Sequence, residues 1–191
     1  MSPPPGDADD AALVKAALAG VESAFTEIMR RHKGAAYRFI RRYVGDRDEA
    51  HDLVQETFVS AWTALPRFDR RRPLSAWLRR IALNKCRDWS RRRRVRSFFY
   101  AAVSLEVSPK ALSAAVEPTD VAQENLVAAL DASLASLPTT LKEPLILTLF
   151  EGLSHKEAAE LLRVSPKAIE TRIYRARQIL AQKLSRQRAN E

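Results

Sequence analysis

The stretch SHKEAAELLRVSPKAIETRIYRARQIL, from Ser154 to Leu180, decides how this chain is organised. Apolar residues recur at helical spacing on both sides of a short break, so the pattern predicts two helices that pack together. Ser165 is a favourable N-cap, and Pro166 suits the first helical position because its missing N–H needs no partner there. The stretch therefore predicts a helix-turn-helix whose second helix is basic.

The second helix of this motif carries polar and charged side chains on the side opposite its apolar face. A recognition helix places such side chains in the major groove, where they contact base edges and phosphates. An ordinary helical hairpin with a solvated charged face is the alternative that the motif alone leaves open. The candidate contacts to duplex DNA are Lys167, Glu170, Thr171, Tyr174 and Arg175.

The composition is typical of a globular all-α protein, because 46% of the residues are hydrophobic, 29% are charged and only 5 are glycine. Helical periodicity recurs while strand-like alternation is nearly absent. The single cysteine, Cys86, excludes an internal disulfide and fits the reducing cytosol. No apolar run approaches membrane-spanning length, and the opening residues do not resemble a signal peptide. We therefore expect a cytoplasmic protein without membrane insertion.

The net charge of +9 is unevenly distributed along the chain. Basic residues outnumber acidic ones in 1–96 and in 137–191, whereas 97–136 are mildly acidic. Two basic blocks suit a polyanion held at two places, because each Lys or Arg on a phosphate releases condensed counterions. Charge that serves only solubility is the alternative.

Proline and glycine residues divide the chain into two predicted helical domains joined by a flexible linker. The predicted helices before the linker span 10–19, 23–43, 46–62 and 75–94, and those after it span 120–134, 141–150 and the helix-turn-helix. The predicted organisation is an N-terminal tail and start of the first helix over 1–20, a first domain over 21–96, a linker over 97–119 and a second domain over 120–191.

The helix that follows Gly45 is predicted to have an apolar inner face and an acidic outer edge. Asp46 is its expected N-cap, and acidic residues fill its first turn, where the helix dipole favours them. The residues expected to face inward are Leu53, Val54, Phe58 and Trp62. The outer edge comprises Asp48, Asp52, Gln55 and Glu56. This edge suits docking onto a basic partner helix, with an ordinary solvated surface as the alternative.

The loop over 66–74 and the helix after it place aromatic residues beside basic ones. These residues are Phe68, Trp77 and Trp89 among Arg70, Arg71, Arg72, Arg79, Arg80, Lys85 and Arg87, followed by the arginines at 91–94. Single-stranded nucleic acid needs that mixture, because its bases stack on aromatic rings while cations follow the phosphates. Core positions are the alternative for the tryptophans, and we favour the core for Trp62 and Trp77, which lie on otherwise apolar helical faces.

Catalysis has little support in the sequence. His32, His51 and His155 lie on polar helical faces without partners at metal-ligand spacing. Neither a glycine-rich phosphate loop nor a nucleophile elbow is present. We therefore predict no catalytic residue, no metal and no cofactor.

Three motifs, taken in order, resemble a bacterial sigma factor of the extracytoplasmic-function (ECF) group, a branch of the sigma-70 family. They are DEAHDLVQETFVSAW, FDRRRPLSAWLRRIALNKCRDWSRRRR and the helix-turn-helix with TRIYRARQIL. The resemblance extends from about residue 24 to residue 184. It implies a protein that binds core RNA polymerase, directs it to promoters and helps to open them, with an anti-sigma factor as a further partner.

The resemblance also implies roles for particular residues. Core polymerase binding falls on Asp52, Gln55 and Glu56. A second set of residues is implied to recognise and melt the minus-ten element, in duplex and single-stranded form. These residues are Phe68, Arg70, Arg71, Arg72, Asn84, Lys85, Asp88, Arg91 and Arg92. Recognition of the minus-thirty-five element falls on the five candidate contacts of the helix-turn-helix.

Two residues depart from the family's pattern. Arg163 stands in the turn where glycine is usual, and it can adopt the left-handed conformation only at some cost. Glu170 stands where a basic or small residue is frequent, and its carboxylate can accept from cytosine N4 but cannot bind a phosphate. The promoter sequence therefore cannot be inferred by analogy.

Two other classes of protein compete with this interpretation. A two-domain helix-turn-helix regulator that does not join the polymerase would share the last motif but would not need the acidic docking edge. A nuclease would be expected to cluster carboxylates around metal ions, and no such cluster is evident in the sequence.

Overall fold

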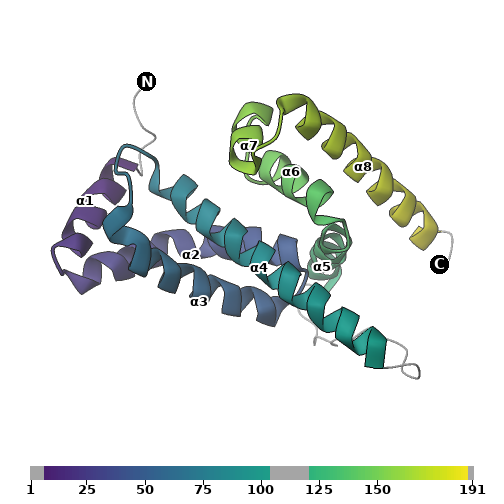
Figure 1. Cartoon of the computed structure of the whole chain (residues 1–191), viewed down its shortest axis with the longest axis horizontal. Coiled ribbons are helices and arrows are strands. Elements are labelled where there is room, and N and C mark those ends of the chain that lie inside the picture. The colour runs from purple at the N-terminus through teal and green to yellow at the C-terminus, as the bar shows by residue number, and fades with distance from the viewer. Residues whose placement is uncertain (1–6, 104–120, 189–191) are drawn as a thin grey trace.

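The computed structural model describes residues 7–103 and 121–188, which contain helices and no strand. The all-α prediction is therefore confirmed for the described residues. A 3-10 turn, η1 (Leu65–Arg67), follows the third helix. The helices in chain order, labelled in Figure 1, are α1 (Asp7–Leu18), α2 (Glu22–Val44), α3 (Arg47–Ala64), α4 (Leu74–Val103), α5 (Val121–Ala135), α6 (Thr139–Leu149), α7 (His155–Leu162) and α8 (Pro166–Arg188).

The first four helices form the first domain, in which α2 contacts α1, α3 and α4 (Figure 1). Apolar residues at helical spacing supply its core, as the periodicity predicted. Ile28 and Ile40 of α2 are fully buried, together with Leu53 and Phe58 of α3 and Leu83 of α4. Burial of these side chains against one another fixes the faces that α3 and α4 present to solvent.

Local sequence signals set the end of α2 and the start of α3. Gly45 has a φ of 79° and ends α2 in the left-handed conformation. The Asp46 carboxylate accepts a hydrogen bond of 2.9 Å from the backbone N–H of Glu49, which confirms the predicted N-cap of α3. The end of α4 differs from the prediction, because the helix continues to Val103 instead of ending near Arg94. The first residues of the predicted linker over 97–119 are therefore helical, and the rest of it, from 104 on, lies outside the described residues.

The second domain contains the predicted helix-turn-helix, formed by α7 and α8. Ser154 caps α7 in a capping box with Glu157, and Ser165 accepts a hydrogen bond of 3.1 Å from the backbone N–H of Ala168 at the start of α8. Ile169 and Ala176 are fully buried. Both the turn and the apolar face of the recognition helix are therefore as predicted.

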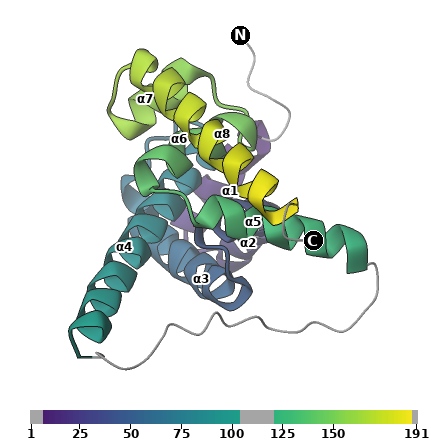
Figure 2. The ribbon, with the colours of Figure 1, turned by 90° about the vertical axis from the view of Figure 1, so that its right-hand side faces the viewer.

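The two domains pack against each other, an arrangement that the sequence did not predict. α5 and α6 contact α2, and α5 runs beside α2 in Figure 2. Burial of Lys142 lowers the pKa of its ammonium group to about 8. That ammonium group donates hydrogen bonds to the carbonyl oxygens of Tyr43, at 2.9 Å, and Ala135, at 2.7 Å. A Cβ atom at Gly45 would lie 2.5 Å from the Cβ of Ala135, so glycine permits this close approach.

No helix within 7–103 and 121–188 has both the length and the apolar character needed to cross a membrane.

Arg163 provides a test of the turn geometry. Its φ of 57° lies in the left-handed region, where a side chain is strained and glycine is not. We expect Arg163→Gly to raise the free energy of unfolding by up to about 1 kcal/mol, because relief of this strain exceeds the entropy that glycine adds to the unfolded chain. Urea unfolding followed by circular dichroism measures the change. Arg163→Ala removes the same side chain but keeps the strain, so a similar gain in that control would contradict the explanation.

Candidate functional site

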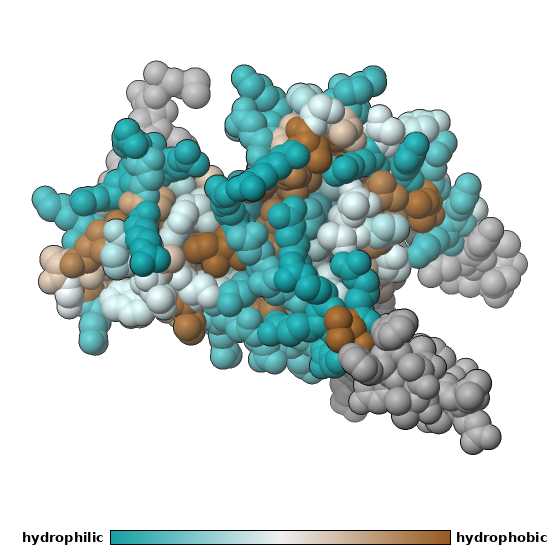
Figure 3. All heavy atoms as spheres, viewed as in Figure 1, coloured by the Kyte–Doolittle hydropathy of each residue, from teal (hydrophilic) through white to brown (hydrophobic). Residues whose placement is uncertain are grey.

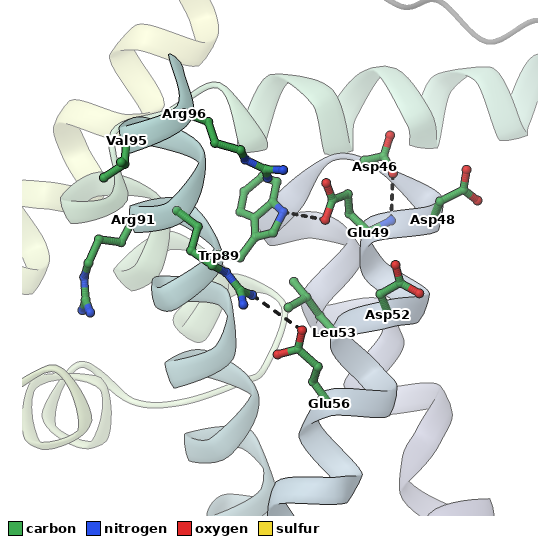
Figure 4. Close-up of a pocket in the computed structure, with 11 residues that line it drawn as sticks. Asp46, Asp48, Glu49, Asp52, Leu53, Glu56, Trp89, Arg91, Val95 and Arg96 are labelled. Atoms are coloured by element: carbon green, nitrogen blue, oxygen red, sulfur yellow. Dashed lines mark hydrogen bonds and ion pairs between the residues drawn. The ribbon is translucent and has the colours of Figure 1, made fainter. Parts of the chain in front are cut away.

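A groove of about 960 Å³ separates the first half of α3 from the second half of α4. Its two walls carry opposite charge, as Figure 4 shows, with carboxylates on α3 and arginines on α4. Leu53, Trp89 and Val95 provide apolar lining between these walls. The acidic wall comprises Asp46, Asp48, Glu49, Asp52 and Glu56, and the basic wall comprises Arg91, Arg92 and Arg96. The groove therefore joins part of the predicted polymerase-binding edge to part of the predicted minus-ten surface.

The three residues predicted to bind the polymerase do not share one environment. Asp52 and Gln55 are exposed on α3. Glu56 is half-buried, and its carboxylate lies 3.6 Å from the ammonium group of Lys85 and 3.6 Å from the guanidinium group of Arg92. Glu56 is thus engaged with α4, which leaves Asp52 and Gln55 as the polar residues of this set with an open outward face.

The predicted minus-ten residues occupy the loop before α4 and one side of α4 itself. Arg71 and Arg72 pair with Asp69 at 3.0 and 3.7 Å, and hydrogen bonds from Arg71 hold the pKa of the Asp69 carboxyl below its ordinary value. This pairing organises a loop in which Arg70 remains exposed. Phe68 is half-buried, and its ring centroid lies 4.9 Å from that of Trp77.

Asn84 is exposed on α4, one helical turn before the exposed Asp88. Asp88 pairs with Arg91 at 3.3 Å along the same helix. In the close-up of Figure 4, the side chain of Arg91 points away from the α3 wall. The face seen in Figure 3 is mostly hydrophilic over α4, with apolar areas that are small and separate.

Two tryptophans differ from their predicted roles. Trp62, predicted to be a core residue, is 45% exposed, and the edge of its ring system packs against Phe25 with centroids 4.8 Å apart. Trp89, considered as a stacking surface for bases, is only 5% exposed and donates a hydrogen bond of 2.7 Å to Glu49. Trp77 is half-buried and packs on the core, as favoured from the sequence. Periodicity could not decide these cases, because both sides of α3 and α4 carry apolar residues.

All five predicted contacts of the recognition helix are exposed on α8. Lys167 donates a hydrogen bond of 2.9 Å to Glu170 and thereby lowers the pKa of that carboxyl. The Nδ1 atom of His155 lies 4.0 Å from Glu170, so the first helix of the motif also faces this carboxylate. Tyr174 accepts a hydrogen bond of 2.8 Å from the Gln178 amide. The start of α8 therefore presents an exposed polar face of mixed charge.

Ion pairs between the domains had no signal in the sequence, and α4 contributes the arginine to two of them. Arg79 pairs with Glu151 at 3.0 Å, and Arg87 binds Glu143 through two hydrogen bonds of 2.6 and 2.7 Å. The partners lie 72 and 56 residues apart in the chain, so neither helical spacing nor a local motif could have paired them.

Two other titratable groups of the described residues are paired or buried in the first domain. His32 differs from its predicted setting, since its Nε2 atom lies 2.8 Å from the carboxylate of the buried Asp10. Cys86 is fully buried, and burial raises the pKa of its thiol. Within the described ranges, no three residues of the His, Cys, Asp and Glu types are grouped so that they could hold a metal ion.

The sequence matches two protein families. Along the chain, the two matches follow the same order as the α3–α4 surfaces and the helix-turn-helix described above. Sigma-70 region 2 matches residues 28–96, which include α3, the loop and most of α4. Sigma-70 region 4 matches residues 128–180, which include the helix-turn-helix.

Curated relatives match over nearly the whole chain. The RNA polymerase sigma factor CnrH of Cupriavidus metallidurans is 40% identical over 91% of this chain and 92% of its own length. NccH of Alcaligenes xylosoxydans xylosoxydans, also an RNA polymerase sigma factor, is 37% identical over 88% of this chain and 90% of its own. The ECF sigma factor SigW of Bacillus subtilis is 29% identical over 90% of this chain and 94% of its own.

Solved structures agree with these matches. CnrH in complex with the cytosolic domain of CnrY superposes with a TM-score of 0.65 and 34% identity, covering 92% of this chain and 97% of that one. RpoE from Bartonella quintana, in complex with the anti-sigma factor NepR, gives a TM-score of 0.62 and 25% identity over 84% and 96%. The chain belongs to the ECF group of the sigma-70 family of RNA polymerase sigma factors.

Proposed function

We propose that this chain joins core RNA polymerase through α3, captures the minus-ten element with the loop and α4, and reads the minus-thirty-five element with α8. The observation that carries the proposal is the presence of all three surfaces in one chain, in the order of the two matched sigma regions. A helix-turn-helix regulator that acts without the polymerase is not favoured, because such a regulator needs no domain of the sigma-70 region 2 type, and residues 28–96 match that region.

The docking surface for the polymerase, in this proposal, is a stripe along α3 that combines charged and apolar side chains. Asp52, Gln55, Val59 and Trp62 follow one another at spacings of three and four residues, so they share one helical face. Val59 is 67% exposed and Trp62 is 45% exposed. Exposed tryptophan is typical of the anchoring residues of protein interfaces, and a neighbouring carboxylate would favour a basic partner helix.

The proposed minus-ten surface combines an amide, arginines and an aromatic pair. Asn84 is exposed and can offer both a donor and an acceptor to an unstacked base. Arg70, Arg91 and Arg92 are exposed and can contact phosphates of the strand. Trp89 has no direct part in this proposal, because its buried indole is held by Glu49. Phe68 and Trp77 remain the aromatic residues at the edge of the surface.

The proposed partners follow from this function. They are core RNA polymerase, promoter DNA and an anti-sigma factor, since CnrH and RpoE were solved with CnrY and NepR. Sigma factors are initiation factors and not catalysts, so no active site is proposed. Because polymerase and promoters are cytoplasmic in bacteria, we place the chain there.

The docking stripe can be tested by charge reversal. Asp52→Lys should weaken binding to core polymerase by about tenfold, because it brings two like charges together in the interface. Competition between the variant and wild-type protein for limiting core measures the change. Glu160→Lys makes the same charge change on exposed α7 and serves as the matched control. Equal competition by the Asp52 variant and the wild type would refute the stripe.

The recognition helix can be tested at Arg175. Arg175→Ala should cost about 1 to 3 kcal/mol of binding at one base pair of the minus-thirty-five element if its guanidinium contacts a base edge. Holoenzyme binding to promoters substituted singly at each position measures this loss. Arg177→Ala, two residues along α8, should leave the sequence preference unchanged. Uniform weakening on every promoter would instead make Arg175 a phosphate contact.

The proposed role of Asn84 in capturing the strand predicts that its loss affects promoter melting and not promoter binding. Asn84→Ala should leave duplex binding through α8 nearly unchanged but impair opening, because contacts to an extruded base form only after unpairing. Permanganate reactivity of promoter thymines in the holoenzyme complex reports the opening. A template with a preformed bubble should rescue the variant. Wild-type reactivity in the variant would exclude the role, and failure of the rescue would indicate a structural defect in α4.

A further inference from the structure

Arginine side chains line a cavity of about 280 Å³ where α4, α6 and α8 meet. Helix α4 contributes Arg87, Arg91 and Arg94, and α8 contributes Arg172. The other lining residues are Ser90, Thr139, Thr140, Glu143 and Leu162. Among the described residues of this lining, Glu143 is the only acidic one, so the cavity carries an excess of positive charge.

The carboxylate of Glu143 compensates only one of these arginines. Both of its oxygens accept hydrogen bonds from the guanidinium group of Arg87, at 2.7 and 2.6 Å. Arg91 pairs with a carboxylate of α4 that lies outside the cavity. Among the side chains that the structure describes, no carboxylate forms an ion pair with Arg94 or Arg172. These two guanidinium groups can therefore bind an anion without first losing a partner.

The positive charges of the cavity repel one another. The three arginines of α4 follow at spacings of four and three residues, so they share one helical face, and like charges at such spacings destabilise a helix. Arg172 adds a fourth guanidinium group from α8, where it is half-buried. An anion among these groups would relieve the repulsion. A phosphate suits this position, because the N–H donors of a guanidinium group match the geometry of its oxygens.

The start of α6 adds donors of a second kind to the same cavity. The residue before this helix is Pro138, which provides no side-chain cap. Its carbonyl oxygen accepts hydrogen bonds from the backbone N–H groups of Leu141 and Lys142. The N–H groups of Thr139 and Thr140 have no acceptor within the described residues. Such N–H groups at the start of a helix favour phosphate, and both threonine hydroxyls can donate as well.

The size of the cavity and its access restrict the ligand. Sites for drug-sized ligands typically measure about 300 to 1,000 Å³, so this cavity suits a small anion and not a whole nucleotide. Arg91 and Arg94 are exposed, so an anion can enter from solvent. A nucleic acid strand needs a basic groove that follows successive phosphates. Here the donors instead converge from three helices on one small volume.

We propose that this cavity is a binding site for a small, multiply charged oxyanion of the phosphate type, such as inorganic phosphate or pyrophosphate. Arg94 and Arg172 hold the anion from two sides, and the N–H groups at the start of α6 bind its remaining oxygens. The site is independent of the promoter-binding role proposed for α4. A bound anion contacts both domains, so it increases the free energy of unfolding of the whole chain.

Calorimetric titration of the full-length chain with pyrophosphate tests the site, at constant ionic strength so that screening does not change. One anion should bind per chain. Arg94→Gln with Arg172→Gln should lower the affinity at least tenfold, because two charge-assisted contacts are lost. Arg38→Gln with Arg177→Gln removes the same charge at exposed positions of α2 and α8 outside the cavity, and should bind like the wild type. Equal affinities of the two double variants would overturn the proposal.

A single variant at an exposed position distinguishes loss of the site from a folding defect, since Arg172 is half-buried. Arg94→Glu adds a carboxylate to the lining and should abolish binding while the Tm without anion stays near that of the wild type. Pyrophosphate at about 100 times its Kd should raise the wild-type Tm by about 5 to 10 °C. Arg38→Glu, the matched reversal on α2, should keep this rise. The proposal fails if the wild-type Tm does not respond to pyrophosphate.

Two further ligands distinguish a small free anion from larger carriers of phosphate. Adenosine diphosphate and a DNA strand of about four nucleotides offer the same phosphate chemistry attached to groups that the cavity cannot enclose. Pyrophosphate should bind more tightly than either of them, and inorganic phosphate should compete with it. Tighter binding of the nucleotide or the strand, lost in Arg94→Gln with Arg172→Gln, would overturn the assignment to a small anion.

Discussion

The contact between the end of α2 and the start of α6 determines how the parts of this protein lie relative to one another. Lys142 and Glu143 are adjacent, oppositely charged and almost fully buried. Each has a partner on the other domain: the Tyr43 carbonyl for Lys142, and Arg87 with the Tyr43 hydroxyl for Glu143. Loss of one partner from such a buried set typically costs about 3 to 5 kcal/mol, so few other docking geometries can satisfy both charges.

The arginines of α4 pair with carboxylates in this structure, and the proposed function adds phosphates as competing partners. On α4, Arg92 lies near Glu56, whereas Arg79 and Arg87 are paired across the domain interface. A guanidinium group binds either anion through the same fork of N–H donors, and a polyanion has the additional advantage of counterion release. The internal carboxylates can therefore hold the arginines in place without excluding a nucleic acid that competes for them. In the proposed function, the same guanidinium groups that order the free chain also provide affinity for the promoter strand.

The sequence predicted the exposed face of α8 correctly but did not separate core from surface on α3 and α4, and the difference has a physical reason. The polar face of α8 follows from its helical phase, because the other face must cover a small domain. In α3 and α4 the helical phase does not separate core positions from surface positions, because each helix packs on one side and carries exposed apolar residues on the other. Trp62 and Trp89 look alike in the sequence, yet one is half-exposed and the other is buried with Glu49 as its partner. The side chain's neighbours, and not its type, decided between core and surface.

The sequence by itself determined the helices, their caps and the two domains, because these depend on contacts within a few residues. Asp46 and Ser165 cap their helices as their positions predict, and Ser154 caps α7 in the same way. The motifs also determined the family, because three of them occur in the expected order. Only the tertiary structure decided which charged residues meet. Glu56 faces α4, and Glu143 and Glu151 reach arginines 56 and 72 residues away. Such pairs depend on how two finished domains dock, a long-range choice that local periodicity cannot encode.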